Sequence, residues 1–104
     1  MSSLDDRQNA FENKFAHDAE MQFKADARRN KLLGLWAADL MGKSGADAEA
    51  YAKDVIKSDF EEAGDEDVFR KVAGDLGGKT DEATLRAKMA ELMAEAKSQL
   101  MNEL

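Results

Sequence analysis

Apolar residues recur through most of this chain at the three-and-four spacing that marks one face of an α-helix. Three stretches with this spacing are predicted to be helices, over residues 47–63, 66–76 and 81–102. Their apolar stripes are Ala48, Tyr51, Ala52, Val55, Ile56, Phe60 and Ala63, then Val68, Phe69, Val72, Ala73 and Leu76, then Leu85, Met89, Leu92, Ala96 and Leu100. Because each helix has one face to bury, the helices must pack on one another.

Glycines with neighbouring capping residues separate the predicted helices, at residues 42–45, 64–65 and 77–80. In each turn a glycine can take the left-handed conformation that ends a helix, and a following Ser, Asp or Thr can cap the next one. The chain contains no proline to interrupt its helices. The predicted fold is therefore all-α, a four-helix bundle whose first helix precedes residue 42.

The first helix differs from the other three because its apolar pattern changes along its length. Its last part is broadly apolar and is expected in the core through Leu32, Leu33, Leu35, Trp36, Leu40 and Met41. Upstream, the apolar residues stand four apart, at Phe11, Phe15, Ala19 and Phe23. This makes a narrow stripe that drifts by about 40° per step.

The upstream stripe is too far from the core for the domain to cover it. One continuous helix from Leu4 to Met41 would be about 57 Å long, whereas a domain of this size has a radius of gyration of about 13 Å. The N-terminal segment is therefore expected to be extended or loosely ordered. It must project, fold back, or wait for a partner to cover Phe11 and Phe15.

Length and charge limit the classes of protein that this chain can be. Its 104 residues make one compact domain, and its net charge of −7 argues against sequence-independent binding to nucleic acid. Residues 1–31 carry six basic and six acidic side chains, so the remainder carries the whole excess. No signal peptide begins the chain, and the most apolar stretch, 32–41, is far shorter than a membrane span of about 20 residues. A soluble, intracellular protein without membrane insertion is expected.

No catalytic or metal-binding pattern stands out. The chain has no cysteine and one histidine, His17, so a metal site or hydrolytic triad has little to build on. The turns at 42–44 and 78–80 spell Gly-Lys-Ser and Gly-Lys-Thr, but both lack the first glycine and the preceding strand of a phosphate-binding loop. We therefore predict a binding or regulatory protein with no enzymatic activity and no required cofactor.

The one dense basic cluster is Arg28-Arg29-Asn30-Lys31. Two interpretations stay open for it. It is either a solvated helix face beside the apolar end of the first helix, or a phosphate site, since the planar guanidinium of arginine offers paired donors to phosphate oxygens.

Three long stretches make the sequence similar to a known family. They are FENKFAHDAEMQFKADARRNKLLGLWAADLMGK over 11–43, DFEEAGDEDVFRKVAGDL over 59–76 and DEATLRAKMAELMAEAKSQ over 81–99. With them the chain resembles the zeta subunit family of alphaproteobacterial F-type ATP synthases, the ATPase inhibitor zeta proteins. The resemblance covers essentially the whole chain.

The resemblance implies a function as well as a fold. Residues 1–20 are expected to be an inhibitory segment and residues 21–104 a helical bundle. The segment would stop ATP hydrolysis by entering an interface between an alpha and a beta subunit near the gamma stalk. Such a protein would be cytoplasmic and held at the inner membrane through the enzyme. The resemblance also implies that the bundle binds ADP or ATP without hydrolysing it.

Candidate residues follow for each role. We expect Phe11 and Phe15 to be apolar anchors of the inhibitory segment, because a partner groove could bury them. The polar residues expected to contact the partner are Asp5, Asp6, Arg7, Glu12, Lys14 and Asp18. The candidates for nucleotide binding are Arg28, Arg29 and Lys31. Two alternative functions stay open: a free-standing adenine-nucleotide sensor, and a generic helical adaptor that self-associates through its last helix.

Overall fold

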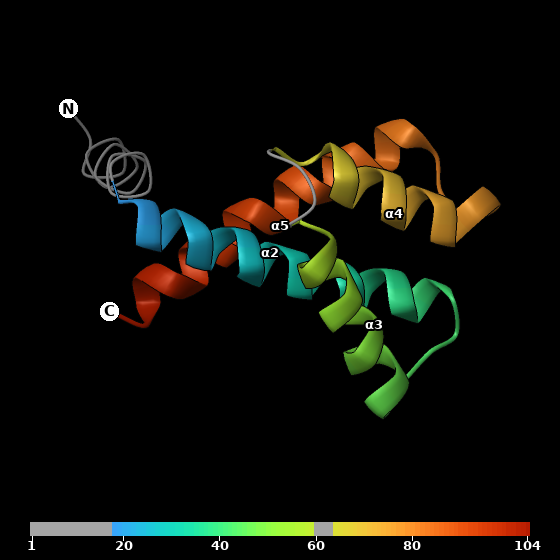
Figure 1. Cartoon of the computed structure of the whole chain (residues 1–104), viewed down its shortest axis with the longest axis horizontal. Helices are drawn as coiled ribbons and strands as arrows, with labels where there is room; N and C mark the ends of the chain where they lie inside the picture. Colours follow the sequence, from blue (N-terminus) through green and yellow to red (C-terminus); the bar gives the residue numbers. More distant parts are fainter. Residues whose placement is uncertain (1–17, 60–63) are drawn as a thin grey trace.

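The computed structural model describes residues 18–59 and 64–104, and every regular element within them is helical. The elements are α2 (Ala19–Leu40), α3 (Gly45–Ser58), α4 (Glu66–Leu76), a short 3-10 turn η1 (Gly77–Lys79) and α5 (Glu82–Asn102) (Figure 1). The prediction of an all-α, four-helix fold is confirmed. The helix predicted over residues 66–76 has those bounds in the structure. The helix predicted over residues 47–63 ends at Ser58 rather than at residue 63.

Helix α2 is the centre of the bundle, because it contacts α3, α4 and α5. In Figure 1, α5 crosses α2 obliquely, and α3 and α4 lie toward the C-terminal half of α2. The arrangement follows from the apolar faces, since each of the shorter helices has only one stripe to bury against its neighbours. No helix in the described part of the chain is long and apolar enough to cross a membrane.

The main core gathers the stripes that the sequence predicts. Its buried members come from all four helices: Leu33, Ala37, Ala38, Tyr51, Val55, Val68, Val72, Leu76, Leu85, Met89 and Leu92. Leu32, Trp36 and Met41 pack against this core while remaining partly exposed. The prediction that Leu40 lies in the core is wrong, because Leu40 is 40% exposed. It is the last residue of α2, where the chain turns toward α3, and Met41 packs against the core next to it.

A second, smaller core joins the start of α2 to the end of α5. Met21 and Ala25 of α2 meet Leu100 of α5, with Met93 and Met101 packed beside them. This contact fixes the N-terminal end of α2 against the C-terminal end of α5. The position of Asp18, where the described chain begins, is therefore determined by this packing.

Helices α2 and α3 cross at very short range at Gly34. A Cβ atom added to Gly34 would lie 2.5 Å from the Cα atom of Ala52, a distance that real Cβ atoms do not show. The two backbones can approach this closely only because one residue has no side chain and the other has a methyl group.

The turns confirm the predicted glycines but not every predicted cap. Gly77 ends α4 with a φ of 57°, in the left-handed region. The cap of α5 is Asp81 rather than Thr80, and its carboxylate accepts a hydrogen bond from the backbone N–H of Thr84 at 2.7 Å. Asp65 occupies the N-cap position of α4 without forming a side-chain cap. Its carboxylate is bound elsewhere, as described below.

Candidate functional site

Most of the predicted partner-binding residues lie outside the described part of the chain. These are Asp5, Asp6, Arg7, Phe11, Glu12, Lys14 and Phe15. Their contacts therefore remain predictions from the sequence. The structure describes the eighth residue, Asp18, and all three candidates for nucleotide binding, Arg28, Arg29 and Lys31.

Asp18 is the N-cap of α2. Its backbone is extended, with φ −117° and ψ 100°, and its carboxylate accepts a hydrogen bond from the backbone N–H of Met21 at 3.1 Å. A cap of this kind satisfies one of the N–H groups that the first turn of a helix leaves without a partner. Asp18 thus determines where α2 begins, a role within the bundle that the sequence analysis did not assign to it.

Replacing Asp18 with alanine is expected to lower the free energy of unfolding by about 1 kcal/mol, because the cap is lost. Urea denaturation followed by circular dichroism measures this change. The matched control is Glu20→Ala, which removes another acidic residue of the same turn whose salt bridge to Lys24 is exposed. Equal stability of the Asp18 and Glu20 variants would show that the cap contributes nothing.

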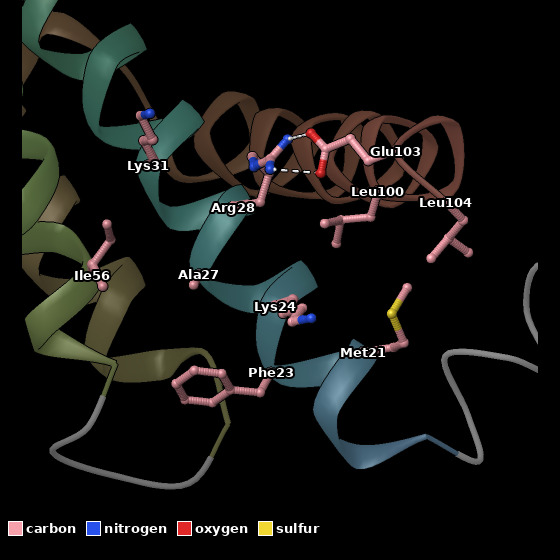
Figure 2. A pocket seen from close by; sticks show the side chains of 10 residues that line it. All are labelled: Met21, Phe23, Lys24, Ala27, Arg28, Lys31, Ile56, Leu100, Glu103 and Leu104. Atoms are coloured by element: carbon pink, nitrogen blue, oxygen red, sulfur yellow. Dashed lines mark hydrogen bonds and ion pairs between the residues drawn. The ribbon is translucent and has the colours of Figure 1, made fainter.

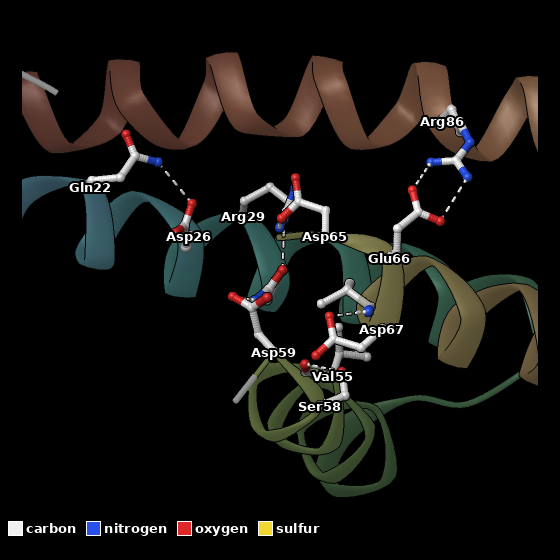
Figure 3. A network of polar contacts seen from close by, with 12 residues as sticks. Gln22, Asp26, Arg29, Val55, Ser58, Asp59, Asp65, Glu66, Asp67 and Arg86 are labelled. Carbon is white, nitrogen blue, oxygen red and sulfur yellow. Dashed lines mark hydrogen bonds and ion pairs between the residues drawn. The ribbon is translucent and has the colours of Figure 1, made fainter. Parts of the chain in front are cut away.

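Arg29 is buried and belongs to a polar cluster that ties three helices together (Figure 3). Its side chain is only 2% exposed. Its Nε donates to Oδ1 of Asn30 at 2.6 Å, and its Nη2 donates to Oδ1 of Asp65 at 2.7 Å. Asn30 in turn donates from Nδ2 to Oδ2 of Asp59 at 3.1 Å. We call these four residues the Arg29 cluster.

The Arg29 cluster holds α2 to both ends of the connection between α3 and α4. Asp59 is the C-cap residue of α3, and Asp65 is the N-cap residue of α4. Burial raises the pKa of Asp59, and this effect outweighs the lowering by the hydrogen bond from Asn30 and the charge of Arg29. The guanidinium of Arg29 is bound within the fold through Asn30 and Asp65, and its side chain is almost completely buried.

Arg28 and Lys31 line an open groove between the start of α2, α3 and the end of α5 (Figure 2). We call it the α2–α5 groove, and it has a volume of about 520 Å³. Its lining residues are Met21, Phe23, Lys24, Ala27, Arg28, Lys31, Ile56, Leu100, Glu103 and Leu104. Three cations, spaced four and three residues apart on one face of α2, stand beside exposed apolar side chains.

Arg28 is held in place within this groove. Its two terminal nitrogens donate to the two carboxylate oxygens of Glu103 at 2.9 and 3.1 Å, and Nη1 also donates to Oε1 of Gln99 at 2.8 Å. The hydrogen bonds from Arg28 lower the pKa of Glu103. The ion pair fixes the orientation of the guanidinium and ties α2 to the last turn of α5.

Arg28 and Arg29 are adjacent in the sequence but lie in different surroundings in the structure. Arg28 and Arg29 differ by about 100° around the helix, so one lines the groove and the other enters the Arg29 cluster. Arg29 is buried and is therefore not on a solvated face, whereas Arg28 is partly exposed. The third cation of the groove is Lys24, which lies outside the dense basic cluster of residues 28–31. The spacing of Lys24, Arg28 and Lys31 is the signal that could have identified it.

Acidic side chains of the described residues are not gathered into a candidate metal site. Within residues 18–59 and 64–104, no three His, Cys, Asp or Glu side chains are grouped so that they could hold a metal ion.

Comparisons with known proteins identify a family and a similar solved structure. A family model described as ATPase inhibitor subunit zeta matches residues 1–99. Among solved structures, a chain determined by solution NMR is 68% identical, with a TM-score of 0.76, and the match covers 81% of this chain and 99% of that one. A search of curated proteins found no match.

Proposed function

The chain belongs to the ATPase inhibitor subunit zeta family, and from that premise we propose that its N-terminal segment, residues 1–20, inhibits ATP hydrolysis by an F-type ATP synthase. The observation that carries the proposal is the family match, which begins at residue 1 and so includes the segment as well as the bundle. The family supports an inhibitory role, and the proposal adds which part of the chain inhibits and how.

The segment would act by occupying an interface between an alpha and a beta subunit near the gamma stalk. Phe11 and Phe15 would bury their rings in a groove of the partner, and burying one phenylalanine is worth about 1.5–3 kcal/mol. Catalysis in a rotary ATPase requires its catalytic interfaces to close, so a helix wedged in one interface stops hydrolysis. Such an inhibitor acts by binding alone and needs no catalytic group of its own.

The bundle would hold the segment at one end of α2. Asp18 begins α2 with a cap, and Met21 and Ala25 fix that end of the helix against α5. The bundle cannot follow the segment into a narrow interface, because four packed helices are much wider than one. We therefore propose the division between segment and bundle close to residue 20.

The double variant Phe11→Ala, Phe15→Ala is expected to raise the concentration for half-maximal inhibition at least about 100-fold, since two buried rings are lost. The measurement is ATP hydrolysis by the purified catalytic head with added full-length protein. Asn13→Ala is the matched control, because it changes the same segment at a position not predicted to contact the partner. Undiminished inhibition by the folded double variant would exclude the anchor role.

The second candidate function is adenine-nucleotide sensing by the bundle. The observation that favours it is the α2–α5 groove, where Arg28 and Lys31 could face phosphates and the exposed ring of Phe23 could stack on a base. Titrating ATP or ADP into the protein and following backbone amide shifts tests binding. Removing residues 1–19 then separates the two functions, because a sensor without an inhibitory segment would keep its effect on the target.

A further inference from the structure

We propose that the α2–α5 groove is a second docking surface for the ATPase, which receives an acidic region of the enzyme next to the point where residues 1–17 enter it. The inference rests on the proposed function and extends it from the segment to the bundle. The partner that fits the groove is a protein surface with carboxylates placed around an apolar side chain.

Chain connectivity places the groove near the enzyme. The segment joins the bundle at Asp18, and Phe23 and Lys24 follow within the first two turns of α2. Five residues of helix rise only about 8 Å. If residues 1–17 occupy an interface of the enzyme, the near end of the groove lies within contact distance of the surface around that interface.

Exposed apolar side chains gather at this end of the bundle. In the described residues, the strongly exposed large apolar side chains are Phe23 at 57%, Leu40 at 40% and Leu104 at 75%. Phe23 and Leu104 line the groove, whereas Leu40 lies at the opposite end of α2. Exposed apolar groups that gather within a groove mark a binding site more often than scattered ones do.

The charge of the groove determines the chemistry of its partner. Lys24, Arg28 and Lys31 project from one face of α2, on a chain whose net charge is −7 (Figure 2). Such a local patch attracts an acidic surface although the protein as a whole is acidic. Arg28 is paired with Glu103, so Lys24 and Lys31 supply the positive charge that a partner would meet.

The salt bridge of Lys24 can be exchanged on binding. It pairs with Glu20 at 3.3 Å, and the two side chains are 52% and 77% exposed. An exposed pair of this kind contributes little to the stability of the fold. A carboxylate of the enzyme can therefore replace Glu20 at a small cost, while the ring of Phe23 supplies an aromatic anchor of the kind that dominates protein interfaces.

Other occupants fit the groove less well. A second copy of the chain in a symmetric dimer would place the same cations of both copies against each other, which is repulsive. A nucleotide would have to compete for Arg28 with Glu103, whose carboxylate already holds two donors of the guanidinium. A protein surface would contact only the exposed sides of Arg28 and Glu103 and would not have to separate them.

The test measures inhibition of the catalytic head by full-length variants. Lys24→Glu combined with Lys31→Glu is expected to raise the concentration for half-maximal inhibition about 10- to 30-fold, and Phe23→Ala about 5- to 10-fold. Because the attraction is electrostatic, added salt should weaken inhibition by the unaltered protein and leave the charge-reversed variant less affected.

Matched controls separate a local effect from a general one. Lys53→Glu combined with Lys57→Glu makes the same change of net charge on exposed positions of α3, and Leu40→Ala removes the exposed apolar side chain at the far end of α2. Both controls should inhibit like the unaltered protein. Equal losses in the groove variants and the controls, or no loss in either, would overturn the proposal.

The remaining outcomes distinguish this inference from the proposed function. If the unaltered protein does not inhibit, the proposed function itself fails. If Phe11→Ala, Phe15→Ala abolishes inhibition and the groove variants do not reduce it, only the docking surface is excluded. The groove is a nucleotide site instead if its variants lose ATP-induced amide shifts but inhibit normally. It is a self-association surface if they lose concentration-dependent association in sedimentation and inhibit normally.

Discussion

Replacing Asp65 with alanine is expected to lower the free energy of unfolding by about 3 kcal/mol, more than removing Arg29 itself. Asp65 is about half exposed, whereas its partner Arg29 is 2% exposed. Without Asp65, the guanidinium stays buried without its direct counter-ion, and Asn30 supplies only a neutral acceptor. Asp59 still interacts electrostatically with Arg29. The expected loss of unfolding free energy is therefore at the lower end of the range for removing one partner of a buried ion pair.

The reverse substitution, Arg29→Met, is expected to cost only about 1 kcal/mol. It removes the buried charge together with its desolvation penalty, and a methionine of similar volume can fill the space. Asp65 is then hydrated at the surface, and the main loss is the hydrogen bond to Asn30. The order of the two variants, with the exposed partner costing more, follows directly from where each group lies.

Urea denaturation of both variants and of the double variant measures this asymmetry and gives the coupling between the two residues. Glu66→Ala is the control, because it removes the neighbouring acidic residue, whose bidentate ion pair with Arg86 is exposed on both sides. Its effect should be much smaller. Were Arg29→Met to destabilise the protein more than Asp65→Ala, the account of Arg29 as a buried, costly charge would be wrong.

Replacing Gly34 with alanine is expected to lower the free energy of unfolding by about 1–2 kcal/mol, although alanine favours helix over glycine by about 1 kcal/mol. The added Cβ would lie 2.5 Å from the Cα of Ala52, a backbone atom that cannot rotate away. Helices α2 and α3 would have to separate, which loosens the packing of Leu33 and Val55 between them.

Gly74→Ala is the matched control for this prediction. Gly74 also lies inside a helix, α4, but nothing stands within 4 Å of the place where its Cβ would be. The substitution there is expected to raise the free energy of unfolding by about 0.5–1 kcal/mol. Thermal and urea denaturation of the pair should therefore give changes of opposite sign. Changes of the same sign would contradict the close crossing at Gly34.

These stability variants also bear on nucleotide binding. If Arg29 holds the fold and not a phosphate, Arg29→Met should leave any ATP-induced amide shifts of the groove residues in place. This result would distinguish the groove residues Arg28 and Lys31 from Arg29, which lies between them in the sequence but is buried.

The sequence predicted the helices well because their apolar stripes are regular. The stripe of α5 is an example: Leu85, Met89, Leu92, Ala96 and Leu100 are the residues found buried. Periodicity reports which face a helix buries, and this part of the prediction needs no knowledge of the neighbours. It fails at the ends, as at Leu40, because a periodic pattern does not show where packing stops.

The candidate site was predicted less completely, for two physical reasons. A run of basic residues does not show which of them face a neighbouring helix, and so Arg29 was grouped with Arg28 and Lys31. The partner of a buried cation can lie far away in the sequence, as Asp65 does from Arg29, and only packing brings the two together. Asp18 is an N-cap of α2 in the structure, and its predicted contact with a partner stays a prediction.

The sequence by itself determined the fold class, the positions of the helices and the family, because periodic apolar faces and long matching stretches are local properties of the chain. Only the tertiary structure decided which cations are free to meet a partner and which are committed to the fold. The Arg29 cluster, the close crossing at Gly34 and the α2–α5 groove all join residues from different helices. Their chemistry depends on burial, and burial is fixed only when the helices pack.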